Sequence, residues 1–529
     1  MRRFALLAAL PALWLIGCGH VKATGHSAGG AVLRYPVVVE PSDLDPDRLN
    51  DIYPSEMLQN VYEGLVTFDV DNKIAPAIAE KWDISRDGKT YTFHLRPNAK
   101  FHNGRVVTAA DMKYTFERSL KDPKSPVALN YLGPIVGAQA LHDGKARELA
   151  GVRAVDARTL EIKIGRPRGY FLGMLTYPTA WAVCREEIEK NGGRIDEHIQ
   201  AGSGPYRLTE YRHGAKIVME AFDGYWAGRP KLDRIERPIV IDYQTAHLQF
   251  ENGEVDACEM ALSDYVNDLK SPALKDQAHA YPYAAIQYVV MHPKLQPAFR
   301  DRRVRRAIAM AIDKDAIAVS AGRGVWERAD SFIPPGIPGS NGGIRPISYD
   351  PAAARKLLAE AGYPDGKGFP HLTLVYVQKQ PESEAAAEVI RENLRRNLGI
   401  EVDLQSREAA EFIANTGERE TIAFWTAGWI ADYPDPQDFL STLLRTGAPL
   451  NHVAYSNPAF DSLCDRADAL SDMSARIPLY RQADQIAMDD VAVLPLFARK
   501  QHYLVKPWVK DFQVNVMMPL PHKTTRIEK

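Results

Sequence analysis

The chain has 529 residues, 25% charged and 45% hydrophobic, with a formal net charge of -2 at pH 7. This is an ordinary globular composition, and the length exceeds what one compact core usually organises, so we expect two or three domains. Because the charge is nearly balanced and no extended basic block occurs, the composition argues against nucleic acid as a partner.

The first residues have the pattern of a lipoprotein signal. Arg2-Arg3 precede an apolar run, Phe4 to Ile16, and Gly17-Cys18 follow it. The run is shorter than the roughly 18 to 20 apolar residues that span a bilayer, whereas a signal h-region of about 7 to 15 residues fits. We predict cleavage after Gly17, lipidation of Cys18 and anchoring by several acyl chains. An ordinary signal peptide or a short membrane anchor is the alternative.

Residues 19–30 are rich in Gly, Ser, Ala and His, which predicts a flexible tether between membrane and folded body. No second apolar run of spanning length follows. The predicted location is the periplasmic or extracellular face of a membrane, with inner and outer membrane both open. Beyond Cys18, three widely spaced cysteines without C-x-x-C spacing indicate neither a zinc site nor a disulfide framework, although one bridge remains open. They are Cys184, Cys258 and Cys464.

The next part of the chain mixes strand and helix patterns. Tyr91, Phe93 and Leu95 alternate with polar residues, which predicts a strand with one buried face. Residues 108–111, Thr-Ala-Ala-Asp, resemble a capping box and predict the start of a helix. Alternation returns at 159–164. We assign this region to a lobe of its own.

Strands and helices alternate farther along the chain. A strand pattern at residues 239–241 is followed by a helix around 246–252 and by a short apolar segment near Val255. This order predicts a βαβ unit. The order is clearer in the C-terminal half, with a strand at 372–377, a helix at 385–398, alternation at 400–404 and a strand at 422–425. This order favours an open, largely parallel sheet whose ligand crevice lies beyond the carboxyl ends of its strands.

Catalytic signatures are mostly missing, including H-E-x-x-H, G-x-S-x-G and the phosphate-binding glycine motifs. Gly202-Ser203-Gly204 is too short for a nucleophile elbow, and Pro205 directly after it favours a tight turn. His94 and His102 have no third ligand at hand, so we expect neither a metal nor a cofactor. The sequence predicts a protein that is not an enzyme.

The densest polar motif is Asp432-Tyr433-Pro434-Asp435-Pro436. We interpret Asp435 as a helix N-cap with Pro436 at the first helical position. For Asp432, motif chemistry alone favours a turn over a ligand contact.

A series of short motifs runs through nearly the whole mature chain, each weak by itself. They are Leu44-Asp45-Pro46, Asn60 to Leu65, Trp82, Tyr91 to Arg96, Phe101 to Gly104, Thr108 to Asp111, Gly202 to Tyr206, Phe299 to Ala307 and Ala311 to Lys314. In number, order and spacing they resemble the family 5 extracellular solute-binding proteins, the oligopeptide- and dipeptide-binding components of ABC importers.

This resemblance implies an α/β fold, a type II periplasmic-binding-protein-like clamshell of three lobes with mixed sheets and flanking helices. We expect lobe I to combine residues 31–74, 189–275 and 490–529. Lobe II is an insertion at 75–188, and lobe III covers 276–489. The implied function is the capture of peptides, by a monomer, for the permease of an ABC transporter.

The resemblance also implies a binding site. In peptide-binding relatives, the Asp after a Trp, in a segment like Gly428 to Tyr433, receives the peptide's α-ammonium group while nearby backbone pairs with the extended peptide. The implied ligand-binding residues are Asp432, Trp429, Gly428 and Ile430, with packing in a lobe core as the alternative for Trp429. A carboxylate and an ammonium form a charge-assisted hydrogen bond, and strand addition tolerates many sequences.

Two departures from the family pattern leave the ligand open. His292 stands where an Asn commonly precedes the Pro-Phe segment, and Ala298 separates Pro297 from Phe299. Other family members bind nickel chelates, haem, sugars or opines, and no residue is assigned to a peptide's carboxylate. Two further alternatives are a secreted hydrolase that uses Asp432 and Asp435, and a receptor that senses peptides without transport.

Overall fold

The computed structural model describes residues 30–529 except 50, 126, 198–200, 341–342 and 418. The predicted signal, Cys18 and nearly all of the predicted tether lie outside the described residues. In the described part of the chain, none of the helices combines the length and the apolar character needed to span a membrane.

The first sheet joins the start of the described chain to strands far along the sequence. Its order is β1-β10-β9-β8, with β1 (Val32–Arg34) parallel to β10 (Arg234–Pro238). A hairpin connects β8 (Tyr206–Arg212) to β9 (Lys216–Ala221). Gly214 makes the hairpin turn possible, because its φ of 65° lies in the left-handed region.

The second sheet is antiparallel throughout and has the order β4-β5-β7-β6. Its strands are β4 (Ala79–Ile84), β5 (Thr90–Leu95), β6 (Val152–Ala154) and β7 (Thr159–Lys163). Tyr91, Phe93 and Leu95 are buried, which confirms the predicted one-sided strand. Helix α2 (Ala109–Lys121) begins after Thr108, whose backbone N–H donates to Asp111 Oδ2 at 2.8 Å, so the predicted capping box is confirmed.

The third sheet has seven strands and is mixed. From β11 through β17, β12 and β16 the neighbours are antiparallel, and only the β16-β14-β15 part is parallel. The prediction of a largely parallel sheet is therefore wrong, because the longest strands, β12 and β17, pair antiparallel with each other. The strands are β11 (Ala257–Glu259), β12 (Ala278–Met291), β13 (Glu327–Arg328), β14 (Leu372–Val377), β15 (Val402–Arg407), β16 (Phe424–Ile430) and β17 (Leu494–Val505).

The βαβ unit predicted near residue 240 is also wrong. Strand β10 ends at Pro238, and Ile239 makes only an isolated bridge to Val37. Helix α7 (Tyr243–Glu251) forms close to where it was predicted, but it leads into β11, which belongs to a different sheet. The local pattern predicted the helix correctly, whereas the strand's partner depends on distant residues.

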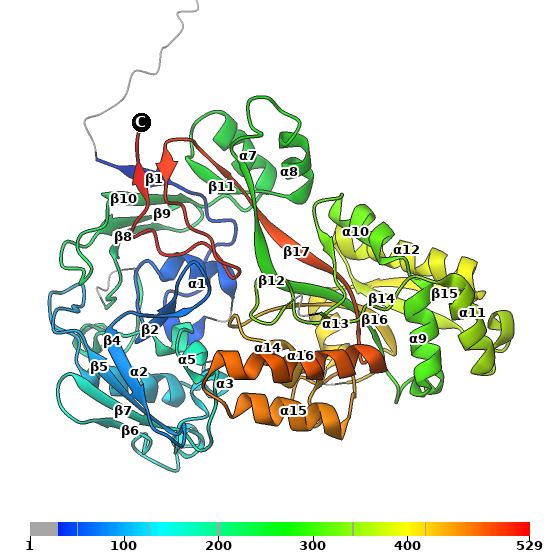
Figure 1. The fold of residues 1–529 in the computed structure, drawn as a ribbon. Coiled ribbons are helices and arrows are strands. Elements are labelled where there is room, and N and C mark those ends of the chain that lie inside the picture. The colour runs from blue at the N-terminus through cyan, green and yellow to red at the C-terminus, as the bar shows by residue number, and fades with distance from the viewer. Residues whose placement is uncertain (1–29, 50, 126, 198–200, 341–342, 418) are drawn as a thin grey trace, which may run out of the picture.

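Helices cover both faces of the β12-β16-β14 part of the third sheet (Figure 1). Along β12, Val289 and Met291 pack in one hydrophobic cluster with α9 to α12, while Tyr288 and Val290 pack in another with α14 to α16. Successive side chains of a strand point to opposite faces of the sheet, and here both faces are buried. The helices are α9 (Arg302–Ala311), α10 (Lys314–Gly322), α11 (Pro351–Glu360), α12 (Pro381–Leu398), α13 (Ala409–Thr416), α14 (Gln437–Leu444), α15 (Pro458–Asp468) and α16 (Met473–Asp490).

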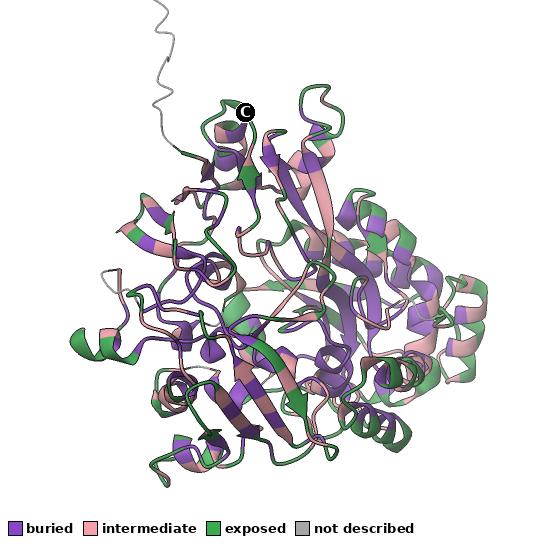
Figure 2. Ribbon diagram, turned by 60° about the vertical axis from the view of Figure 1, so that its left-hand side comes forward, coloured by how far each residue is buried: buried purple, intermediate pink, exposed green. Residues whose placement is uncertain are grey.

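Shorter elements complete the fold. The short helices are α1 (Ile52–Leu58), α3 (Ala128–Leu132), α4 (Ala138–His142), α5 (Phe171–Met174), α6 (Arg185–Lys190) and α8 (Leu262–Asp268). Two small hairpin-like pairs are β2 (Val66–Phe68) with β3 (Ile74–Pro76) and β18 (Val509–Lys510) with β19 (Arg526–Ile527). Figure 2 shows buried strands inside and helices with exposed outer faces at the periphery.

Two long strands, β12 and β17, run side by side from the region of α7 and α8 toward α14 and α16 (Figure 1). Their register shifts between Pro282 and Ile286, so residues 283–285 leave the β17 ladder. The break places Tyr283 among the residues that line a cavity. The lobe boundaries given above remain a prediction.

Candidate functional site

Two adjoining cavities lie between segments that are distant in the sequence. Their volumes are about 570 and 440 Å³, within the range of about 300 to 1,000 Å³ usual for small-molecule sites. We call the larger the Arg499 cavity and the smaller the Asp432 cavity, after one lining residue of each. Five residues line both, so the two cavities form one cleft: Ile52, Tyr53, Ile430, Met517 and Met518.

Asp432 lies just beyond the end of β16 and lines the cavity named after it. Its surroundings raise the pKa of the Asp432 carboxyl to about 6, because desolvation disfavours the charged form, while the Tyr131 hydroxyl acts in the opposite direction. The Tyr131 ring is stacked on Tyr177, with centroids 3.6 Å apart. Tyr177 also lines the Asp432 cavity. The site therefore presents a carboxyl group next to a stacked aromatic pair.

A second carboxyl, Asp438 on α14, fixes the segment that carries Asp432. Asp438 is buried, and its Oδ2 accepts hydrogen bonds from the Asp432 backbone N–H at 2.9 Å and from Trp429 Nε1 at 3.0 Å. Burial, and then the nearby charge of Asp432, raise the pKa of Asp438 well above its usual range. Both hydrogen bonds hold the end of β16 against the first turn of α14.

Trp429 is placed differently from Asp432. Its side chain is half-buried and packs against the cluster that contains α14 to α16. Neither Trp429 nor Gly428 is among the residues that line the two cavities. Trp429 therefore packs as expected for the alternative role, in the core of a lobe. The cavity geometry does not support the predicted contact between its ring and a ligand.

Strand β16 has an edge that is free near the cleft. Ala431 N donates to Ala284 O at 2.8 Å, so the odd-numbered residues of β16 direct their N–H and C=O groups toward β12. The backbone N–H and C=O groups of Gly428 and Ile430 point away from β12, toward the side of β16 where β14 lies. Strand β14 pairs with β16 only at Trp425. Within the described residues these groups of Gly428 and Ile430 face no strand, and Ile430 lines both cavities.

Gly428 lies against the side chain of its neighbour on β12. A Cβ atom built at this position would lie 2.1 Å from Gln287 Oε1. Gln287 pairs with Gly428 in the ladder, and its Nε2 donates to Ser383 Oγ at 3.3 Å. A side chain at residue 428 would therefore displace Gln287.

Asp435 has a structural role beside the start of helix α14, one residue before the N-cap position. Helix α14 starts at Gln437 with Pro436 as its N-cap, so the prediction of Asp435 as N-cap is wrong by one position, although Asp435 Oδ1 still accepts from Gln437 N at 2.9 Å. The carboxylate also forms two hydrogen bonds, of 2.6 and 2.8 Å, with the buried Arg476 guanidinium. Asp435 is not among the cavity-lining residues, so the carboxylate pair of the hydrolase alternative does not share a cavity.

The Gly202-Ser203-Gly204 segment is a close backbone crossing and not a tight turn. Gly204 N donates to Val61 O at 2.8 Å, and a Cβ atom at Gly202 would lie 2.3 Å from that same oxygen. The buried His102 ring contacts Gly204 O at 3.1 Å. The glycines thus allow two chains to approach. The cysteines Cys184, Cys258 and Cys464 are free and buried.

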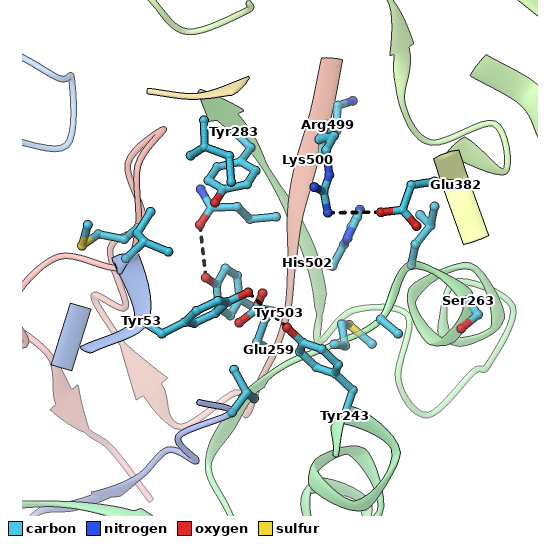
Figure 3. Close-up of a pocket in the computed structure, with 18 of the residues that line it drawn as sticks. Tyr53, Tyr243, Glu259, Ser263, Tyr283, Glu382, Arg499, Lys500, His502 and Tyr503 are labelled. Atoms are coloured by element: carbon cyan, nitrogen blue, oxygen red, sulfur yellow. Dashed lines mark hydrogen bonds and ion pairs between the residues drawn. The ribbon is translucent and has the colours of Figure 1, made fainter. Parts of the chain in front are cut away.

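Sequence reasoning missed the Arg499 cavity, which Figure 3 shows. Five tyrosines line it: Tyr35, Tyr53, Tyr243, Tyr283 and Tyr503. Glu259 also lines it, and burial together with the charge of Glu56 raises the pKa of Glu259 to about 7, against the effect of Arg499. One signal was available, because a polar run from Arg499 to His502 interrupts the apolar residues of β17.

Comparison with known proteins assigns the chain to a family. The family model for the middle region of the bacterial extracellular solute-binding proteins, family 5, matches residues 73–450. The chain belongs to this family. Among family 5 relatives, the dipeptide-binding protein DppE of Bacillus subtilis is 31% identical over 505 residues, covering 93% of this chain and 90% of DppE. Haem-binding protein A of Haemophilus influenzae is 29% identical, covering 86% and 84%.

Solved structures of family 5 proteins share the fold. The unliganded open form of the murein tripeptide-binding protein MppA superposes with a TM-score of 0.82 at 27% identity, covering 94% of this chain and 98% of MppA. DppA of Helicobacter pylori in complex with the peptide STSA gives a TM-score of 0.74 at 26% identity, covering 94% and 98%. The α/β solute-binding fold predicted from the sequence is confirmed.

Proposed function

We propose that the protein captures peptides in the cleft and delivers them, as a monomer, to the permease of an ABC transporter. The observation that carries this proposal is a carboxyl group, Asp432, beside the free backbone groups of Gly428 and Ile430. A peptide in extended form offers its ammonium group to the Asp432 carboxylate. Its backbone N–H and C=O groups can pair with those of Gly428 and Ile430. Peptide-binding relatives such as DppE and the DppA complex support the choice of ligand.

The proposed cycle includes closure of the lobes around the peptide. The chain superposes on the unliganded open form of MppA with a TM-score of 0.82, which supports an open arrangement as the starting point of this cycle. A peptide that contacts both sides of the cleft has a higher affinity for the closed state, and this difference drives closure. The lobes that move in this proposal are lobe II (75–188) and lobe III (276–489).

Native mass spectrometry of protein purified from its host tests the proposal. We expect peptides to co-purify, and we expect a peptide pool to be recovered bound and chemically intact after incubation. Haem, a metal chelate or a sugar in place of peptides would contradict the proposed ligand. Steady cleavage of the pool would contradict a purely binding role and favour a hydrolase.

The affinity for peptides should depend on pH through Asp432. Its pKa in the free protein is about 6, raised by desolvation, and an ammonium ligand binds the carboxylate form. Below pH 6 the group must release a proton on binding, so affinity falls by up to about tenfold per pH unit. Above about pH 8 the peptide's own amine loses its proton. Calorimetric titrations across this range should give a maximum between the two limits, and a flat profile would contradict it.

We also propose that Cys18 carries the lipid anchor that holds the protein outside the cytoplasm. A thioether-linked diacylglycerol plus an acylated amine would make membrane binding stable. A Cys18→Ala variant expressed in the native host is expected to leave the membrane fraction and to lose metabolic labelling by a clickable palmitate analogue. Retention of label in the variant would exclude this anchor.

A further inference from the structure

The passage between the two cavities is apolar. We give this name to the five residues that line both cavities: Ile52, Tyr53, Ile430, Met517 and Met518. The Tyr53 hydroxyl is the only polar side-chain group among these five, and it lies 3.3 Å from the Tyr243 hydroxyl. Charged residues line each cavity on either side of the passage. A ligand that extends from one cavity into the other therefore crosses an apolar gap.

The two methionines of the passage come from a turn near the C-terminus, residues 515–518. Asn515 holds this turn, because its Oδ1 accepts hydrogen bonds from the backbone N–H of Met517 at 2.8 Å and of Met518 at 3.0 Å. The Asn515 carbonyl oxygen accepts from Gln501 Nε2, on β17, at 3.1 Å. The turn is thus fixed at its backbone, while the half-buried Met518 keeps the rotational freedom of an unbranched side chain.

Ala284 connects this turn to the free edge of β16. Its backbone N–H donates to Val516 O at 2.7 Å, and its carbonyl oxygen accepts from Ala431 N at 2.8 Å. Ala284 is available to the turn because residues 283–285 leave the β17 ladder. The two hydrogen bonds place the methionine turn beside Ile430, the residue before Ala431.

A peptide strand that pairs with the free backbone groups of Ile430 brings one side chain into the passage. Directly opposed residues of neighbouring strands point their side chains to the same face, and Ile430 lines both cavities. Met517 belongs to the hydrophobic cluster that contains α14 to α16, and Met518 packs against it. A thioether side chain adapts to neighbours of different size, whereas a polar group buried without a partner costs free energy.

We propose that Met517 and Met518 make the passage selective for an apolar side chain on the ligand residue that pairs with Ile430. This inference rests on the proposed function and adds a sequence preference at one position of the peptide. Apolar side chains of several sizes fit, because methionine adapts its shape to each. A polar or charged side chain there loses most of its hydrogen bonds to water, since the passage offers a single hydroxyl group in return.

Calorimetry with short alanine peptides of increasing length tests the assignment, with Leu or its near-isostere Asn placed at one position at a time. At the position beside Ile430, the native protein should bind the Leu peptide about 10- to 150-fold more tightly than the Asn peptide. Met518→Gln keeps the length of the side chain and adds an amide, so it should reduce this ratio about tenfold. Met518→Leu keeps the passage apolar and should retain the ratio.

Met310→Gln is the matched control, because Met310 is also half-buried but is not among the residues that line the two cavities. It should keep the full preference for Leu. The assignment is overturned if no position distinguishes Leu from Asn in the native protein, a comparison that needs no variant. It is also overturned if Met518→Gln keeps the full ratio, or if Met310→Gln loses it as well.

The same peptides separate this assignment from the proposed function. Any of the three contradicting results leaves the proposed function standing, provided that the peptides bind and that amino-terminal acetylation abolishes their binding. Absence of binding to all the peptides overturns both.

Discussion

Asp432→Asn is expected to weaken binding of peptides with a free amino terminus by about 2 to 5 kcal/mol, about 30- to 5,000-fold in Kd. The substitution keeps the shape of the side chain and removes the charge that faces the ammonium group. In a closed cleft that ammonium would then be desolvated without a counter-charge. Titration calorimetry at pH 7, between the pKa of Asp432 and that of the peptide amine, gives the clearest measurement.

Two controls isolate the role of Asp432. Asp51 lines the same cavity and caps α1 by accepting from Tyr53 N at 3.0 Å, a role that Asn also fulfils. Asp51→Asn should therefore change affinity little, although it alters the cavity charge by the same amount. An amino-terminally acetylated peptide should bind the native protein and Asp432→Asn equally weakly. Native affinity in Asp432→Asn would remove this residue from the site.

Asp435→Asn is expected to lower the free energy of unfolding by about 3 to 5 kcal/mol. Arg476 is fully buried and forms two hydrogen bonds with Asp435, so the variant leaves a buried guanidinium without its carboxylate. Tyr480 Oη, 2.9 Å from Arg476 Nη2, remains as a neutral partner. Guanidinium chloride unfolding followed by circular dichroism should show the lower midpoint.

The control variants for this pair follow from burial. Asp472 is exposed and caps α16 by accepting from Ser474 N at 2.9 Å, and Asp472→Asn should shift the midpoint only slightly. Replacing both partners, as Asp435→Leu with Arg476→Met, removes the unpaired charge and should recover much of the lost stability. If Asp435→Asn unfolds at the native midpoint, the pair does not have this structural role.

Local patterns predicted local structure well. The alternation at Tyr91, Phe93 and Leu95 and the capping box at Thr108 depend on neighbouring residues, and both are present. The strand predicted at 372–377 has the same limits in β14. Strand partners are set by residues far away, so the sheet was mistaken for a largely parallel one. Strands β12 and β17 escaped prediction, and in β12 Pro282 stands where the ladder breaks.

The candidate site was only partly accessible from the sequence. A resemblance around Gly428 to Tyr433 pointed to Asp432, which does line a cavity. The same reasoning could not separate Trp429, which packs against the α14 to α16 cluster, from residues that face the cleft. Arg499 and Glu259 stand in different strands, β17 and β11, and no spacing in the sequence indicates that they share a cavity.

The unpaired edge of β16 has a consequence for how the protein behaves without a ligand. An open strand edge is a template on which another chain can pair and start aggregation. Here the edge ends at Ile430, which lines both cavities, so we expect the recess to admit a single extended strand more readily than the edge of another sheet. Crowded copies of the protein are thus protected from edge-to-edge association by the same recess that admits the ligand.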